Sequence, residues 1–119
     1  MDENPILEHF NAPYRRGTLT TGTHMGYARS AACGDEVTIF AEITNETINA
    51  ASFIASGCMV CQAAASILCE FIEKKSTSEM NAFNPKAMLD LIGVPLTPRR
   101  QQCGILPLIA LTNALRVKD

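Results

Sequence analysis

Five cysteines give this sequence of 119 residues its most reactive side chains. Three of them, Cys33, Cys58 and Cys103, are widely separated along the chain, and Asp35 follows the first by two residues. A cysteine thiolate binds soft metal ions or attacks sulfur, and a carboxylate adds a harder oxygen ligand. Because five is an odd number, any disulfide scheme leaves at least one thiol unpaired. The cysteines therefore favour reduced thiols with a metal-binding or redox role in the cytoplasm.

These three cysteines are expected at the ends of secondary-structure elements. Cys33 precedes a predicted strand, Cys58 follows another strand and opens a predicted helix, and Cys103 lies in the first turns of the last helix. A helix N-terminus favours a thiolate through its dipole and unpaired N–H groups. The competing interpretation is that each is an ordinary core cysteine. That interpretation weakens for the three together, because each neighbours a turn glycine or a helix start.

The remaining cysteines and the charged side chains are less informative. Cys69 lies eleven residues beyond Cys58, about 16 Å along a continuous helix, and is predicted to be a buried hydrophobic residue. His9 and His24 have no metal-ligand spacing and are predicted to lie on the solvated surface. The pair Arg99–Arg100 is interpreted as solvated, with docking to an acidic partner surface as the alternative.

The hydrophobic pattern predicts the elements that hold these residues. Alternation predicts an antiparallel hairpin, and apolar stripes with caps predict helices before and after it. The segment between the opening helix and the hairpin has the composition of a loop or edge strand. The predicted class is α+β, a small antiparallel sheet of about three strands with helices packed on one face. The predicted strands are 36–43 and 48–55, and the main helices are 59–75, 84–93 and 99–116.

Composition narrows the class of function. Hydrophobic residues make up 47% of the chain and charged residues 18%, which suits one globular domain and argues against disorder. The net charge of −2 argues against a general nucleic-acid binder. The uncharged stretch 47–69 contains several polar residues and changes its period midway, so we predict no membrane partner. The expected state is a monomer or a weak oligomer.

Three separated motifs stand in a characteristic order along nearly the whole chain. They are Cys33-Gly34-Asp35 before a hairpin, Ser56-Gly57-Cys58 opening an Ala/Ser-rich helix, and Cys103 opening the last helix. This order resembles the U-type iron–sulfur cluster scaffold family, the NifU-like, IscU-like and SufU-like proteins. The segment from Ile6 to Pro13 also resembles the N-terminal segment of that family. The resemblance implies one NifU-like N-terminal scaffold domain over residues 1–119, with a SufE/NifU-like fold.

The resemblance also implies a ligand set and a mechanism. Cys33, Cys58 and Cys103 would be the thiolate ligands, and Asp35 the neighbouring carboxylate. A cysteine desulfurase would pass persulfide sulfur to Cys103 or Cys33, iron would enter, and a transient [2Fe–2S] cluster would be assembled and transferred to apo iron–sulfur proteins. Cys61 would be a possible auxiliary ligand, and Zn²⁺ the alternative cofactor.

Some positions depart from the family pattern. Gln102 stands where IscU-like members carry a histidine, and Leu96 to Arg100 does not match their chaperone-binding segment. A second cysteine at position 61 is a SufU-like feature, yet the step from Cys58 to Cys103 leaves little room for the SufU-like insertion. These departures leave open a zinc-bound sulfurtransferase that accepts persulfide sulfur.

A thiol–disulfide oxidoreductase is a further alternative from a different class. A strand followed by a C-x-x-C that opens a helix is the thioredoxin-like context, and Cys58 and Cys61 have that spacing. However, a helix follows Pro98 where a thioredoxin fold requires a hairpin. Cys33, Asp35 and Cys103 would also have no role in that mechanism.

Overall fold

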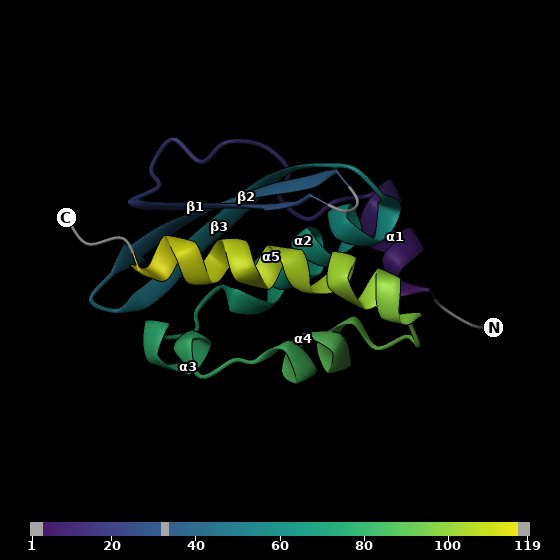
Figure 1. The fold of residues 1–119 in the computed structure, drawn as a ribbon. Coiled ribbons are helices and arrows are strands. Elements are labelled where there is room, and N and C mark those ends of the chain that lie inside the picture. The colour runs from purple at the N-terminus through teal and green to yellow at the C-terminus, as the bar shows by residue number, and fades with distance from the viewer. Residues whose placement is uncertain (1–3, 32–33, 117–119) are drawn as a thin grey trace.

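The computed structural model describes residues 4–31 and 34–116. A three-stranded sheet lies on one side of the molecule and the helices lie on the other (Figure 1). The elements in chain order are α1 (Pro5–Asn11), β1 (His24–Ser30), β2 (Asp35–Thr44), β3 (Thr47–Ser56), α2 (Met59–Ile72), α3 (Thr77–Asn81), α4 (Pro85–Ile92) and α5 (Pro98–Arg116).

The sheet is antiparallel, with the strand order β1-β2-β3. The β2–β3 hairpin turns at Asn45 and Glu46, which have φ values of 52° and 63°. Two consecutive positive φ angles match the right-handed twist of a two-residue hairpin. The register pairs Glu36 with Ser56, so the start of β2 lies beside the end of β3. This register places the segment that follows β3 next to Asp35.

Helices α2 and α5 form the layer against the sheet, and α3 and α4 lie on their far side (Figure 1). Small residues allow both α2 and α5 to approach the sheet closely. Three consecutive alanines of α2 are buried, and a Cβ at Gly26 of β1 would lie 2.0 Å from the backbone oxygen of Ala110 in α5. The predicted α+β class with helices on one face of a three-stranded sheet is confirmed.

Local capping signals account for several helix ends. Ser76 and Glu79 form a capping box at α3, and Asn84 caps α4 with Pro85 at its first position. Gly93 ends α4 with a φ of 80°. Pro107 is buried inside α5, which begins at Pro98. None of the helices in the described part of the chain is long and apolar enough to span a membrane.

A histidine of α1, His9, connects the N-terminal segment to α2 by polar contacts. His9 Nδ1 lies 2.7 Å from the hydroxyl oxygen of the fully buried Ser66, which also accepts the Tyr14 N–H at 2.7 Å. His9 Nε2 lies 3.6 Å from a carboxylate oxygen of Glu70. The prediction of a solvated surface role for His9 is therefore wrong, because its ring bridges α1 to α2.

Ser66→Ala is expected to lower the free energy of unfolding by about 2 kcal/mol, because it leaves the Tyr14 N–H and the His9 ring without their buried partner. Ser52→Ala is the matched control. Within the described residues the buried Ser52 hydroxyl has no hydrogen-bond partner, so its removal should be neutral or stabilising. Urea unfolding of both variants measures the difference. Equal losses in the two variants would contradict the role given to Ser66.

Candidate metal centre

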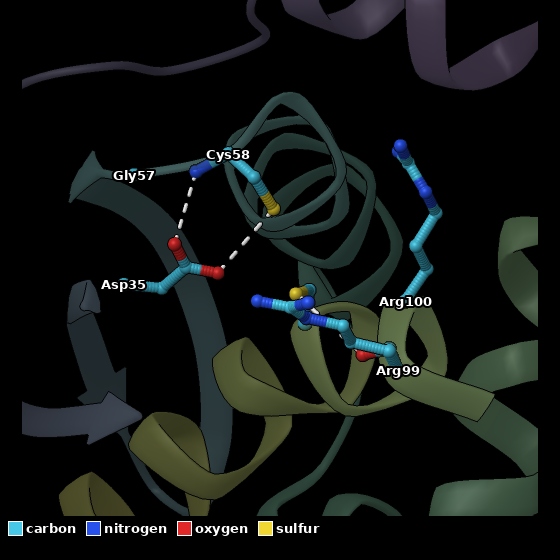
Figure 2. Close-up of a pocket in the computed structure, with 6 residues that line it drawn as sticks. Asp35, Gly57, Cys58, Arg99 and Arg100 are labelled. Carbon is cyan, nitrogen blue, oxygen red and sulfur yellow. Dashed lines mark hydrogen bonds between the residues drawn. The ribbon is translucent and has the colours of Figure 1, made fainter. Parts of the chain in front are cut away.

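Asp35 organises the start of β2 and the start of α2. Its carboxyl is almost fully buried, with a relative exposure of 1%. One oxygen accepts the backbone N–H of Cys58 at 3.0 Å, and the other lies 3.3 Å from the Cys58 sulfur, which donates to it (Figure 2). A single carboxylate thus holds both the backbone and the side chain of Cys58 in place.

Gly57 makes this arrangement possible. Its φ of +120° lies in a region that other residues rarely adopt. A Cβ at this position would also lie 2.1 Å from a carboxylate oxygen of Asp35, closer than any real contact. The Gly-Cys pair is therefore needed both for the turn out of β3 and for the approach of Asp35 to Cys58. The sequence pattern indicated a strand end at Gly57, but not this contact.

Cys58 is the N-cap residue of α2. Its backbone is extended, and its sulfur accepts the N–H of Cys61 at 3.4 Å. The side chain is half-buried, so the sulfur is within reach of a ligand. Its position at the junction of strand and helix agrees with the sequence-based expectation. Capping by sulfur leaves the thiol pointing at the carboxyl of Asp35 (Figure 2).

Cys103 approaches the same place from α5. It is 4% exposed, and its thiol donates to the backbone oxygen of Arg99 at 3.7 Å. Burial raises the pKa of the Cys103 thiol well above its usual value, and hydrogen bonds with Cys58 and Asp35 raise it further. This direction runs against the expectation that a helix N-terminus favours a thiolate at Cys103, and burial is its largest cause.

The three side chains form one potential metal site. One donor atom from each of Asp35, Cys58 and Cys103 lies within 4.8 Å of the others. Two thiolates of a tetrahedral zinc site lie about 3.8 Å apart at normal bond lengths. Two soft sulfur donors and one oxygen donor also suit an iron–sulfur centre. The residues present therefore fit a thiophilic metal ion after a small inward movement of the side chains.

The donors line a cavity of about 360 Å³ at the ends of α2 and α5. Its other walls come from Gly57, Arg99 and Arg100. The arginines belong to the first turn of α5, and residues four apart on a helix share a face, which explains why Arg99 and Cys103 meet there. Both arginines are exposed, as expected of a solvated pair, but that interpretation did not place Arg99 beside Cys103. The spacing from 99 to 103 was the signal available in the sequence.

Two further residues are predicted ligands, Cys33 and Cys61. Cys33 lies outside the described residues, so its role as a ligand stays a prediction. Cys61 is fully buried in α2 and is not part of the Asp35–Cys58–Cys103 cluster. Gln102 is exposed and lines a second cavity between β1 and α5, away from the metal ligands. Cys69 is completely buried, and burial raises the pKa of its thiol, as suits a core residue.

Metal affinity in this site is expected to rise with pH. Because the Cys103 thiol keeps its proton well above its usual pKa, a binding metal must displace that proton. Below the thiol pKa, affinity should increase about tenfold per pH unit for each proton displaced. Zn²⁺ affinities from chelator competition between about pH 6 and about pH 8, one unit either side of neutrality, measure this slope. An affinity that does not change with pH would contradict the protonated state of Cys103.

Comparison with known proteins assigns the chain to one family. Residues 1–117 match the family described as the NifU-like N terminal domain. The chain therefore belongs to the NifU-like N-terminal domain family, the U-type scaffold family that the motifs indicated.

Curated relatives of the chain carry names from this family. The chain is 30% identical over 80 residues to the iron–sulfur cluster assembly scaffold protein IscU of Thermotoga maritima, an alignment that covers 67% of this chain and 56% of that protein. It is 24% identical over 115 residues to an IscU scaffold protein of Archaeoglobus fulgidus, covering 97% of this chain and 74% of the relative. The aligned region thus spans little more than half of the Thermotoga protein.

Solved structures share the fold. A candidate SUF-system cluster assembly scaffold from Fervidobacterium islandicum superimposes with a TM-score of 0.81 at 23% identity, covering 97% of this chain and 96% of the other. The N-terminal part of a NifU-like protein from Brucella abortus gives 0.77 at 19% identity, covering 96% and 91%. At these identities the likeness establishes the fold, and the chemistry must be argued from the site.

Proposed function

We propose that this protein is a scaffold on which an iron–sulfur cluster is assembled and from which it is transferred. It accepts sulfur from a cysteine desulfurase, binds iron, builds a transient [2Fe–2S] cluster and passes it to apo iron–sulfur proteins. The observation that carries the proposal is the convergence of Asp35, Cys58 and Cys103 on one cavity within a NifU-like fold. Family membership and the chemistry of the donor set support it together.

The ligand set suits temporary holding. Cys58 and Cys103 supply thiolates, and we assign the third thiolate to Cys33, which precedes Asp35 by two residues. Asp35 is the harder ligand and binds iron less tightly than sulfur does. A site with one weakly binding ligand can release its cluster to an acceptor that offers thiolates. A closed set of four thiolates would hold the cluster too firmly for transfer.

Sulfur delivery is a thiol exchange in this proposal. The thiolate of Cys103 or Cys33 attacks the outer sulfur of the desulfurase persulfide. The donor's S–S bond breaks, a new S–S bond forms on the scaffold, and the donor cysteine leaves as a thiolate. Cys103 must first lose the proton that burial retains on it. The cavity beside its sulfur provides the approach for a persulfide.

Cluster formation also needs electrons from outside. Two sulfane sulfurs take up four electrons to become sulfide, and two ferrous ions supply two of these as they become ferric. An external one-electron donor or thiol reductant supplies the other two. The chain's own contribution is to hold the iron and the sulfur in one cavity while this happens.

A zinc-dependent sulfurtransferase is the second candidate. It is favoured by the compactness of the donor set, because three donors within 4.8 Å can hold a single ion with one position left open. In that role the metal would orient the acceptor thiol, and no cluster would be built. The thiol–disulfide alternative has less support, since it leaves Asp35 and Cys103, which lie in one cluster with Cys58, without a role.

Metal analysis after anaerobic purification separates the two candidates. The scaffold proposal expects iron and acid-labile sulfide in the purified protein, or their uptake when ferrous iron, L-cysteine and a purified cysteine desulfurase are added. One tightly held Zn²⁺ per chain, with no visible absorbance after that treatment, would favour the sulfurtransferase and overturn the scaffold.

A further inference from the structure

The cavity lined by the proposed metal ligands is also lined by a positively charged side chain, that of Arg99. Arg99 lines it together with Asp35, Cys58 and Cys103, and its backbone oxygen accepts the Cys103 thiol proton. Figure 2 shows the Arg99 side chain extending toward the side of the cavity where Asp35 and Cys58 lie. The Arg100 side chain extends in a different direction, away from those two residues (Figure 2). The two neighbouring arginines therefore differ in their relation to the site.

The guanidinium of Arg99 is available to a ligand. Across residues 4–31 and 34–116, the ion pairs involve His9, Arg15 and Lys86, and none involves Arg99. Asp35 is the acidic residue among those lining the cavity, and its two oxygens are engaged by Cys58. Arg99 is exposed, so incoming anions can reach it.

The surroundings reinforce this positive charge. Helices α2 and α5 both begin at the cavity, and neither has an acidic residue in its first turn. Helix N-termini carry a partial positive charge that favours anions. Two helix N-termini and the Arg99 guanidinium therefore place positive charge around the cavity, whereas the metal ligands that line it are anionic when bound.

Charge balance then indicates what the cation is for. A divalent ion with two thiolates and one carboxylate has a net charge of −1, so a further anionic ligand would raise the negative charge to −2. One guanidinium beside that ligand offsets the added charge. Persulfide and hydrosulfide, the forms in which sulfur would reach the site, are both anions.

We propose that Arg99 is the anion-binding residue of this site. It binds the anionic sulfur ligand that takes the fourth position of a metal held by Asp35, Cys58 and Cys103, in place of Cys33, whereas Arg100 does not. The assignment rests on the proposed function, because it requires that the three donors bind a metal. It concerns a residue that lies outside the ligand set.

Cobalt-substituted protein tests the assignment by spectroscopy. Co²⁺ replaces Zn²⁺ in thiolate sites, and its visible bands shift when a new ligand binds. Thiocyanate, a sulfur-containing anion, is the probe. The proteins compared are the wild type, Arg99→Gln, Arg99→Lys and Arg100→Gln, each titrated at low and high ionic strength.

Arg99→Gln should weaken thiocyanate binding about fivefold at low salt, the effect expected of one exposed ion pair. Arg99→Lys should retain most of the affinity because it keeps the charge, and Arg100→Gln should stay within about twofold of the wild type. At about 1 M salt the difference between wild type and Arg99→Gln should vanish through screening.

The outcomes separate this proposal from the function on which it rests. If Co²⁺ binds and Arg99→Gln matches the wild type, or if both arginine variants lose affinity equally, the role of Arg99 is wrong and the metal site stands. If the wild type binds no Co²⁺ in the presence of reductant, the proposed metal site is wrong and the role of Arg99 falls with it.

Discussion

Cys58→Ser should lose stable metal binding while the protein stays folded. Serine is a favoured N-cap residue, so its hydroxyl can accept the Cys61 N–H and donate to Asp35 as the thiol does. The substitution therefore keeps the local structure and removes only the soft sulfur ligand. With about 10–16 kcal/mol shared among four zinc ligands, the loss of one thiolate should weaken binding about a hundredfold or more.

The measurement is Zn²⁺ affinity by chelator competition, together with urea unfolding of the metal-free protein. Cys61→Ala is the matched control, because Cys61 is the other member of the C-x-x-C and is not part of the donor cluster. It should keep the wild-type affinity. If Cys58→Ser binds Zn²⁺ as tightly as the wild type, Cys58 is not a ligand. If Cys61→Ala loses affinity equally, Cys61 is the auxiliary ligand that the sequence left open.

Asp35→Ala should retain cluster binding but release the cluster more slowly, by about tenfold. The Asp35 carboxylate is the hard ligand of the proposed site, and its dissociation from iron opens a position for an acceptor thiolate. It also adds a buried negative charge beside an anionic cluster, so its removal lowers the repulsion that favours release. Thiolates would then carry more of the binding, and the cluster would persist longer.

Transfer of the cluster to an apo [2Fe–2S] acceptor, followed by circular dichroism, measures the release rate. Asp90→Ala removes an exposed carboxylate on α4, which is paired with Lys86, and is the control for a general change of charge. It should transfer at the wild-type rate. Faster release from Asp35→Ala would mean that Asp35 holds the cluster in place and is not its exchangeable ligand.

The sequence predicts much of the fold because local signals are strong where they exist. The hairpin and the main helices lie close to the ranges that periodicity and capping indicated. Strand β1 could not be assigned bounds from its pattern. Its buried face consists of Gly26 and Ala28, small residues that give no hydrophobic alternation because α5 packs directly on the backbone.

The site was predictable in its residue types but not in its contacts. The order of the motifs indicated Asp35, Cys58 and Cys103, and the structure brings these three together. The fit of Gly57 against Asp35 depends on the register of two strands, which no local pattern encodes. The raised pKa of Cys103 depends on burial among distant segments. Both effects arise from contacts between distant segments of the chain, which only the three-dimensional structure shows.

The directions and partners of the charged side chains also could not be predicted from the sequence. Arg99 and Arg100 look equivalent in the sequence, yet Figure 2 shows Arg99 directed toward the side where Asp35 and Cys58 lie and Arg100 directed away from them. His9 has no metal-ligand spacing and was predicted to lie on the surface, but its bridge to Ser66 spans 57 residues of sequence. Side-chain direction and long-range pairing are therefore what the structure adds.

Anaerobic reconstitution tests the central claim most directly. The wild-type chain is incubated with ferrous iron, L-cysteine, a purified cysteine desulfurase and a thiol reductant, and iron and acid-labile sulfide are counted after desalting. The scaffold account predicts about two iron atoms and two sulfides per cluster, with visible absorbance that Cys58→Ser loses. Protein that leaves the column with no sulfide and no visible absorbance, or with wild-type absorbance in Cys58→Ser, would contradict it.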